Sequence, residues 1–194
     1  ITDDNYKEFV TFPTWLEEKY KRGIITKTHL SDLLRISLLA RYGGIWLDST
    51  FFCTGDLQPY FDMSVWSIKR PDYRHVSVAC GEFANYSFGC TTEYRKVFAI
   101  LREYLLDYWE HYDYMIDYLF LDYLIVLARK QNDYVNQAFN EIIPNNKNCD
   151  ELLKVLGTPF DSSEWEKLKD NTALFKLTWK AVFPRMVDGK KTYY

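Results

Sequence analysis

The clearest pattern in the chain is a helical repeat of apolar residues near its start. Leu30, Leu34 and Leu38 recur at four-residue spacing, which predicts an amphipathic helix over His29–Tyr42. Thr28 can cap its first turn, because a threonine oxygen accepts hydrogen bonds from the free backbone N–H groups there. Two consecutive glycines follow the last helical residue and predict the end of the helix.

The segment after the glycines changes to the pattern of a buried strand. Ile45–Asp48 has three apolar residues before an aspartate, which is typical of a strand in a parallel sheet. Further strand candidates are Val65–Arg70, His75–Cys80 and Ala173–Lys180. Helical patterns occupy Pro13–Arg22, Thr92–Trp109, Asp113–Lys130, a segment that ends at Leu156, and Ser162–Asp170.

This order of elements predicts an α/β fold with a mixed sheet, in one domain over residues 1–194. The polar tail, residues 187–194, is expected to be mobile. The opening segment Ile1–Pro13 has the pattern of a loop that follows a strand, so we expect an N-terminally truncated fragment. The missing strands would be those that hold a nucleotide, because the first strands of an α/β fold often do so.

Charge and composition exclude several classes of function. The 24 bases and 27 acids are interspersed, with a net charge of −3 and no basic stripe, so we expect no nucleic-acid partner. The most apolar run, residues 114–128, is shorter than the roughly 18 residues of a membrane span and contains Asp117 and Asp122. The four cysteines form no Cys-x-x-Cys pair, which argues against structural zinc and favours reduced, buried thiols.

Two residues of opposite charge lie close together in the helix predicted over His29–Tyr42. Asp32 and Arg35 are three residues apart and therefore share a face. One interpretation is a surface ion pair, which would contribute little to stability. The other is a polar ligand site, because the same helix leads into the strand that ends at Asp48, and ligands of open α/β sheets bind beyond strand ends.

Asp48 has two interpretations as well. Aspartate is common in turns and at strand ends. It is also a ligand for hard cations such as Mg²⁺ or Mn²⁺, which accept oxygen atoms from carboxylates, hydroxyls and substrate phosphates. The hydroxyl of Ser49 or Thr50 could complete such a site together with a diphosphate.

Three aspartates lie on the helix predicted over Asp113–Lys130. On that helix Asp113 and Asp117 would share a face, whereas Asp122 would lie about 140° round from Asp117. At least one of them is therefore expected to point inward, where a buried acid must be paired or functional. A hydrogen bond between a tyrosine and an aspartate that holds the helix in place is the alternative.

The segment SDLLRISLLARYGGIWLDST, residues 31–50, resembles the capsular polysaccharide synthesis proteins, a bacterial group of glycosyltransferases. These are related to the DXD-motif glycosyltransferases of the initiating mannosyltransferase type. Their shared pattern is Ser-Asp, two apolar residues and Arg, then a helix, Tyr-Gly-Gly, a short apolar strand and Asp-x-Asp. This chain departs from it at one position, since Thr50 stands where the second acid of that motif is expected.

The resemblance implies a GT-A-like fold that binds a nucleotide-sugar donor, with a divalent metal, Mn²⁺ or Mg²⁺, on the donor's diphosphate. Asp32 and Arg35 match donor-sugar contacts, and Trp46 matches an aromatic position near the donor. Asp48 and Thr50 occupy the metal positions. Because Thr50 is not an acid, a group near the C-terminus, Thr178 or Trp179 by position, could assist.

The resemblance further implies hexosyl transfer with retention of anomeric configuration. Asp117 is the candidate catalytic, sugar-facing residue, and Glu82, Asn85 and Tyr86 are candidates for acceptor or sugar contacts on an aromatic loop. The acceptor would be a growing capsular or surface saccharide, free or lipid-linked. The enzyme would then be cytoplasmic, at the inner face of the membrane, with at most peripheral membrane association.

Two other functions stay open at this point. The Asp-Ser-Thr sequence that replaces Asp-x-Asp would suit a catalytically degenerate module that binds a sugar or nucleotide. A glycoside hydrolase would use Asp48 and Asp117, provided that their carboxyl groups face each other across a sugar-sized cleft.

Overall fold

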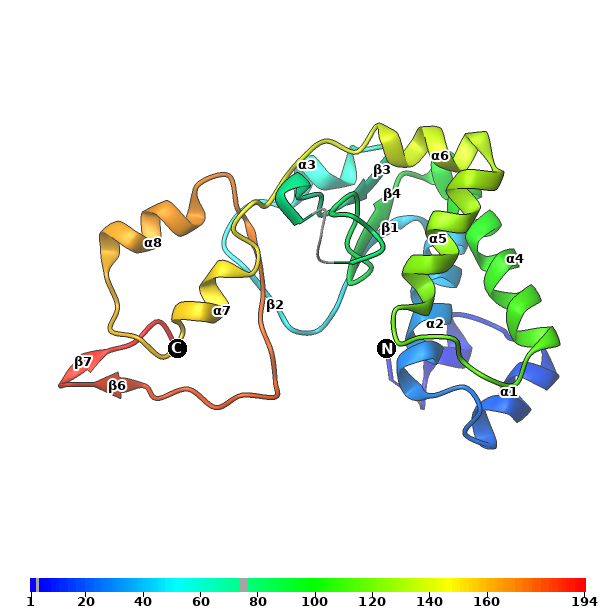
Figure 1. The fold of residues 1–194 in the computed structure, drawn as a ribbon, viewed down its shortest axis with the longest axis horizontal. Helices are drawn as coiled ribbons and strands as arrows, with labels where there is room; N and C mark the ends of the chain where they lie inside the picture. The colour runs from blue at the N-terminus through cyan, green and yellow to red at the C-terminus, as the bar shows by residue number, and fades with distance from the viewer. Residues whose placement is uncertain (3, 74–76) are drawn as a thin grey trace.

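A computed structural model describes residues 1–2, 4–73 and 77–194 (Figure 1). The α-helices are α1 (Thr14–Lys21), α2 (Lys27–Tyr42), α3 (Gln58–Phe61), α4 (Arg95–His111), α5 (Phe120–Gln131), α6 (Asp133–Asn140), α7 (Glu151–Val155) and α8 (Ser162–Lys169). The strands are β1 (Gly44–Leu47), β2 (Phe51–Cys53), β3 (Val65–Ser67), β4 (Ser87–Cys90), β5 (Leu174–Lys176), β6 (Met186–Val187) and β7 (Lys190–Lys191). Short 3₁₀ helices cover Tyr6–Glu8, Pro71–Tyr73 and Thr92–Tyr94.

The α/β class is confirmed, but the predicted mixed sheet is wrong. Among the described residues the strands form three small sheets, β1-β4-β3, β2-β5 and β6-β7, and each pairing is antiparallel. The physical reason is β4, a strand that the turn-rich pattern of residues 81–90 concealed. It lies between β1 and β3 and runs opposite to both, with Trp46 aligned to Phe88 and Trp66 to Gly89.

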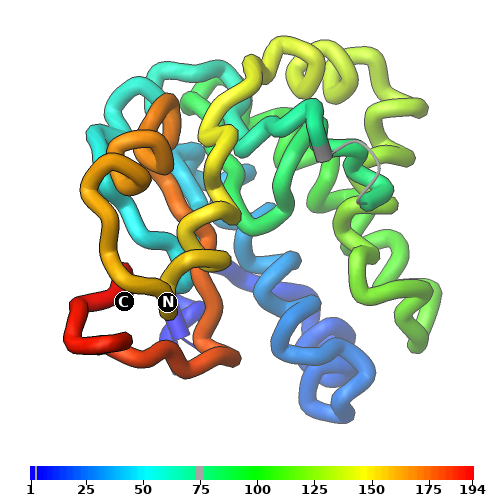
Figure 2. Tube along the Cα trace, turned by 60° about the vertical axis from the view of Figure 1, so that its left-hand side comes forward, coloured from blue at the N-terminus to red at the C-terminus, as the bar shows by residue number. Residues whose placement is uncertain are grey.

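The elements divide into two sides of the molecule. The long helices α2, α4 and α5 pack together on one side, and α7, α8 and β5–β7 lie on the other (Figures 1 and 2). The small sheet β1-β4-β3 lies between them in both views. A large apolar core lies among the helices, and a separate cluster forms where Leu152, Leu168 and Phe175 pack together.

Helix α2 sets the position of the site, and its buried face is rotated from the predicted one. Leu30 is buried as predicted, at 2% exposed. The other fully buried apolar residues are Leu33, Ile36 and Leu39, whereas Leu34 and Leu38 are only partly buried. The cause is α4, which packs along α2 and covers this face. The helix also begins earlier than predicted, because Thr26 rather than Thr28 is its cap and accepts a hydrogen bond from the His29 N–H at 3.4 Å.

The two glycines after α2 are required by the backbone. Gly43 and Gly44 have φ values of 69° and 83°, in the left-handed region that disfavours other residues. A Cβ on Gly43 would also lie 3.0 Å from the Cys90 carbonyl oxygen of β4. The turn therefore brings β1 directly against β4 and places Asp48 just beyond the end of the strand.

The helix predicted over Asp113–Lys130 begins seven residues later than predicted, at Phe120. Residues 112–119 form a loop, in which the Asp117 carboxylate accepts a hydrogen bond from the Leu119 N–H at 2.7 Å. Aspartate competes in this way with helical backbone bonds and favours helix starts. The shared face expected for Asp113 and Asp117 is therefore wrong, because neither residue is helical.

Other differences are local. The tail expected to be mobile forms the β6–β7 hairpin, because Asp188 and Gly189 have the positive φ values, 48° and 73°, of a tight hairpin turn. The strand candidate His75–Cys80 lies partly outside the described residues, and its described part forms bends and turns. The cysteines are free thiols, but only Cys90 and Cys149 are buried. No helix in the described part of the chain has both the length and the apolar character needed to cross a membrane.

Candidate active site

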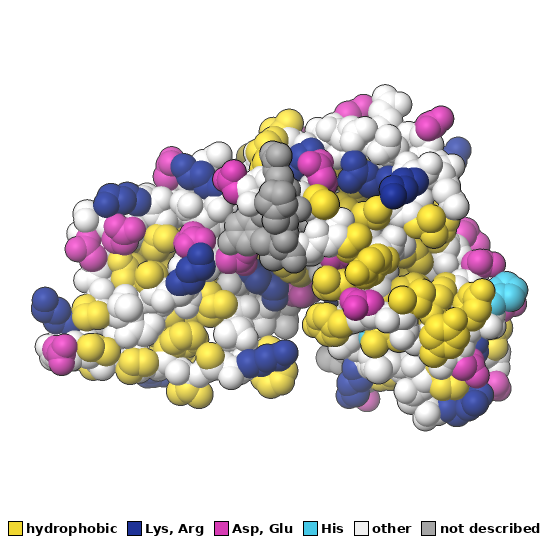
Figure 3. Space-filling view, in the orientation of Figure 1, with side chains coloured by type: hydrophobic (Ala, Val, Ile, Leu, Met, Phe, Trp, Pro, Cys, Tyr) yellow, Lys and Arg dark blue, Asp and Glu magenta, His cyan; other side chains and the backbone are white. Residues whose placement is uncertain are grey.

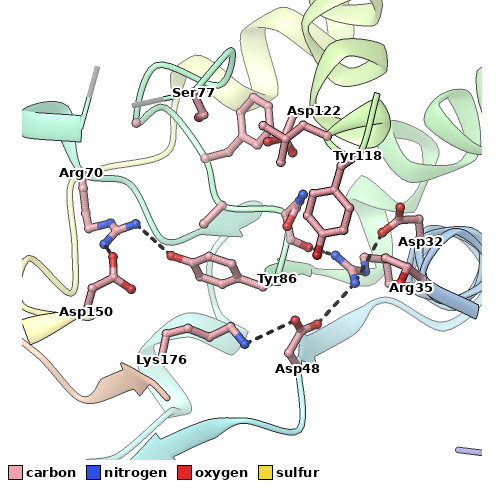
Figure 4. Close-up of a pocket in the computed structure, with 16 residues that line it drawn as sticks. Asp32, Arg35, Asp48, Arg70, Ser77, Tyr86, Tyr118, Asp122, Asp150 and Lys176 are labelled. Atoms are coloured by element: carbon pink, nitrogen blue, oxygen red, sulfur yellow. Dashed lines mark hydrogen bonds and ion pairs between the residues drawn. The ribbon is translucent and has the colours of Figure 1, made fainter. Parts of the chain in front are cut away.

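Three charged residues of the 31–50 segment meet between α2 and the end of β1. An Arg35 guanidinium nitrogen lies 3.5 Å from an Asp32 carboxylate oxygen and 3.4 Å from an Asp48 carboxylate oxygen (Figure 4). The Trp46 indole donates a hydrogen bond to the same Asp48 oxygen at 3.1 Å. The Arg35 guanidinium also lies over the Trp46 ring, 5.5 Å from its centre. A single arginine therefore links the helix to the strand.

The Asp32–Arg35 pair is not a surface ion pair. The two side chains are only 8% and 6% exposed. A buried pair of this kind needs further partners to offset the loss of hydration. Arg35 has one in the Asn85 carbonyl oxygen, to which it donates a hydrogen bond, while its Nε finds no partner among the described residues.

A further carboxyl group, Asp122 on α5, is buried beside this cluster. Burial raises the pKa of Asp122 to about 6, although a hydrogen bond from Asn85 and the charge of Arg35 oppose the rise. One of its carboxylate oxygens has no hydrogen-bond partner within the described residues. Of the three aspartates considered from the sequence, Asp122 is the one that points inward.

Burial raises the pKa of Asp32 as well, to about 7. Arg35 opposes the rise, and the nearby charge of Asp122 adds to it. Near neutral pH the site thus holds two carboxyl groups that can carry or release a proton. Such groups are common at functional sites, because proton transfer needs a pKa close to the working pH.

The Asp48 carboxylate faces a second cation, from β5. Lys176 Nζ lies 3.6 Å from the Asp48 oxygen that Arg35 does not contact, and it donates a hydrogen bond to the Thr50 hydroxyl. Each oxygen of the Asp48 carboxylate therefore lies near one cation, Arg35 for one oxygen and Lys176 for the other (Figure 4).

These contacts bear on the divalent metal implied for Asp48 and Thr50. A hard cation needs several oxygen ligands. Here Asp48 supplies one carboxylate whose two oxygens already face cations, and the Thr50 hydroxyl accepts from Lys176. In the described ranges no three His, Cys, Asp or Glu side chains form a group that could hold a metal ion. The residues present do not fit a metal site.

Two adjoining cavities open around this cluster. The smaller, about 420 Å³, extends from Asp32 and Asp122 towards Tyr86 and Arg70. The larger, about 720 Å³, extends along β1 towards Trp179. Both are lined by Thr28, Arg35, Asp48, Tyr118 and Lys176.

The cavities differ in charge. Charged side chains in the lining of the larger cavity are Lys27, Arg35, Lys176 and Lys180 against Asp48. The smaller cavity is lined by four aspartates, which are balanced by Arg35, Arg70 and Lys176. The larger cavity is therefore suited to an anion, and the smaller to an uncharged ligand rich in hydroxyl groups.

Most of the residues selected from the sequence lie around these cavities. Asp32, Arg35, Asp48, Asn85 and Tyr86 line the smaller one, and Trp46, Thr50, Thr178 and Trp179 line the larger one. Two lie outside both linings. Asp117 is exposed in the loop before α5, and Glu82 forms an ion pair with Lys69 at 2.8 Å.

Several residues of the smaller cavity were not expected from the sequence. Arg70 forms an ion pair with Asp150 and donates a hydrogen bond to the Tyr86 hydroxyl at 2.8 Å. Lys176 was overlooked although it is a lone charge in the apolar run of β5. A single charge in a buried strand was the available signal, because burial of an unpaired lysine is costly.

Comparison with known proteins identifies a family. Residues 1–194 match the family described as capsular polysaccharide synthesis protein. No curated protein and no solved structure matches the chain.

Proposed function

Because the chain belongs to the capsular polysaccharide synthesis protein family, we propose that its site is that of a glycosyltransferase. It would move a sugar from a nucleotide-sugar donor to a saccharide acceptor during the synthesis of capsular or other surface polysaccharide. The observation that carries the proposal is the cluster of Asp32, Arg35 and Asp48 at the junction of two cavities of different charge.

The donor's diphosphate suits the larger cavity. Lysine and arginine side chains outnumber acids in its lining, and phosphate oxygens accept hydrogen bonds from such groups. The rings of Trp46 and Trp179 lie in the same lining, and Trp179 is 80% exposed, so it is free to stack on a nucleotide base.

The donor's sugar suits the smaller cavity. Carboxylate groups accept hydrogen bonds from sugar hydroxyls, and amide groups both accept and donate them. Asp32, Asn85 and Asp122 carry such groups in the lining of this cavity. Asp122, whose carboxyl group also has a hydrogen bond with Asn85, lines this cavity together with Asp32.

In the proposed reaction the acceptor hydroxyl oxygen forms a new bond to the anomeric carbon. The bond from that carbon to the donor phosphate breaks, and its electron pair stays on the diphosphate oxygen. With retention the acceptor approaches on the face of the leaving group, so the departing oxygen takes the hydroxyl proton. In this proposal Arg35 and Lys176, which line both cavities, stabilise the charge that this oxygen gains. Asp122, which lines the smaller cavity, takes the sugar-facing role in place of the exposed Asp117.

Aromatic side chains beside the site suit a saccharide acceptor. Tyr114 and Tyr118 are 61% and 68% exposed in the loop between α4 and α5, and Tyr118 lines both cavities. In Figure 3 hydrophobic side chains gather on the same side of the molecule as α4 and α5. The aromatic faces can pack on the C–H faces of an acceptor sugar, whether that sugar is free or attached to a lipid at the inner membrane face.

The test is a panel of nucleotide sugars incubated with the purified protein, with release of nucleoside diphosphate as the readout. Release in wild type that is lost in Asp48→Asn, and kept in the exposed control Asp62→Asn, would support the proposal. Tight donor binding without release or transfer would instead favour a binding module. Absence of both binding and release would refute the proposed function.

A further inference from the structure

Lys176 contacts both Asp48 and Thr50, the two residues at the metal positions of the Asp-Ser-Thr sequence. Its ammonium lies 3.6 Å from the Asp48 carboxylate and donates a hydrogen bond to the Thr50 hydroxyl. Figure 4 shows the lysine side chain extending towards Asp48, and Lys176 belongs to the lining of the smaller cavity. One cation thus contacts both positions of the altered motif.

The sheet fixes the position of this lysine. Strand β5 pairs with β2 so that Lys176 is aligned with Phe51, and the Leu177 N–H donates to the Thr50 carbonyl oxygen at 2.9 Å. The ammonium also lies over the rings of Phe51 and Tyr86, 5.7 and 5.5 Å from their centres. These contacts restrict a side chain that is otherwise flexible.

The ammonium is also accessible to a ligand. The Lys176 side chain is 21% exposed, and it lines both cavities. An ammonium has three N–H donors, so after the bond to Thr50 it can still donate to an incoming anion. The guanidinium of Arg35 lines the same two cavities from the other side of Asp48.

We propose that Lys176 takes the place of the divalent metal and binds the donor's diphosphate through its ammonium, so that donor binding needs no metal ion. This inference rests on the proposed function, because it names the group that neutralises the diphosphate of the donor. Thr50 fits this arrangement better than an acid would, since its hydroxyl orients the lysine without neutralising it. A lysine is a suitable replacement, because it is a compact point charge that binds phosphate oxygens.

Isothermal titration with UDP, GDP, CDP and ADP tests this proposal, in buffer with EDTA and in buffer with Mn²⁺. The variants are Lys176→Met, Lys176→Arg and the matched control Lys130→Met, which changes an exposed lysine at the end of α5. Thermal unfolding of each variant confirms that it is folded before titration.

The wild type is expected to bind one of the nucleoside diphosphates with the same affinity, within a factor of about two, in EDTA and in Mn²⁺. Lys176→Met should weaken that binding about 10- to 100-fold, since it removes a hydrogen-bonded charge. Lys176→Arg should retain most of the affinity, and Lys130→Met all of it.

Two results would overturn the inference while the proposed function stands: binding by wild type that EDTA abolishes, or equal affinity in wild type and Lys176→Met. Absence of binding to any of the four diphosphates, with or without Mn²⁺, would overturn the proposed function and this inference together.

Discussion

Substitution of Asp122 by asparagine removes a buried carboxyl group whose charge the fold disfavours. Burial raises the pKa of Asp122 from its ordinary value of 3.8 to about 6. Between these two pH values the folded protein keeps a proton that the unfolded chain has lost. Stability therefore falls as the pH rises through this window, and the fall ends above the folded pKa.

The size of this effect follows from the two pKa values. A rise from 3.8 to about 6 corresponds to about 3 kcal/mol of unfolding free energy, of which about 2 kcal/mol is expressed between about pH 4.5 and about pH 8. The asparagine in Asp122→Asn has no carboxyl group and does not titrate in this range. When the pH is raised over this range, we therefore expect the unfolding free energy of the variant to rise by about 2 kcal/mol relative to that of wild type.

Urea unfolding at several pH values measures the difference. The matched control is Asp133→Asn at the exposed start of α6, which should follow the wild-type pH dependence. Some loss of stability with rising pH should persist in Asp122→Asn, because burial raises the pKa of Asp32 as well. The same pH dependence in wild type and Asp122→Asn would refute the burial argument.

Four further substitutions test the framework of the site. Arg35→Met should lower the unfolding free energy by about 3 kcal/mol in urea unfolding, because it leaves a buried carboxyl group without its partner; a loss below 1 kcal/mol would contradict this. Thr26→Ala should cost about 1 kcal/mol through loss of the α2 cap, and an unchanged thermal midpoint would argue against that cap. Gly43→Ala should cost about 2 kcal/mol, more than Gly44→Ala, because only the first added methyl meets a backbone oxygen; equal losses in thermal unfolding would disprove the close contact.

The part of the site that the sequence predicted lies within a short segment. Asp32, Arg35 and Asp48 are joined by a helix, two glycines and a strand, so local geometry alone brings them together. The pattern could not show that Asp32 and Arg35 are buried, because their neighbours include Asn85 and Asp122, which are distant in the sequence. A pair that looked equally suited to the surface is therefore part of the interior.

The part that the sequence did not predict depends on distant pairing. Lys176 reaches Thr50 across 126 residues of chain, through the alignment of β5 with β2. The position of Asp117 depended on a helix that begins only at Phe120, since local hydrogen bonds of the aspartate compete with helix formation. The sheet was predicted wrongly because β4 is a short strand with a glycine in it, which weakens the strand pattern.

A crystal structure of the protein with a bound nucleotide sugar from the panel would test the proposed function most directly. We expect the diphosphate within hydrogen-bond distance of Lys176 and Arg35, and the sugar in the smaller cavity against Asp32 and Asp122. A donor bound elsewhere on the protein, or a diphosphate held away from both cations, would contradict it.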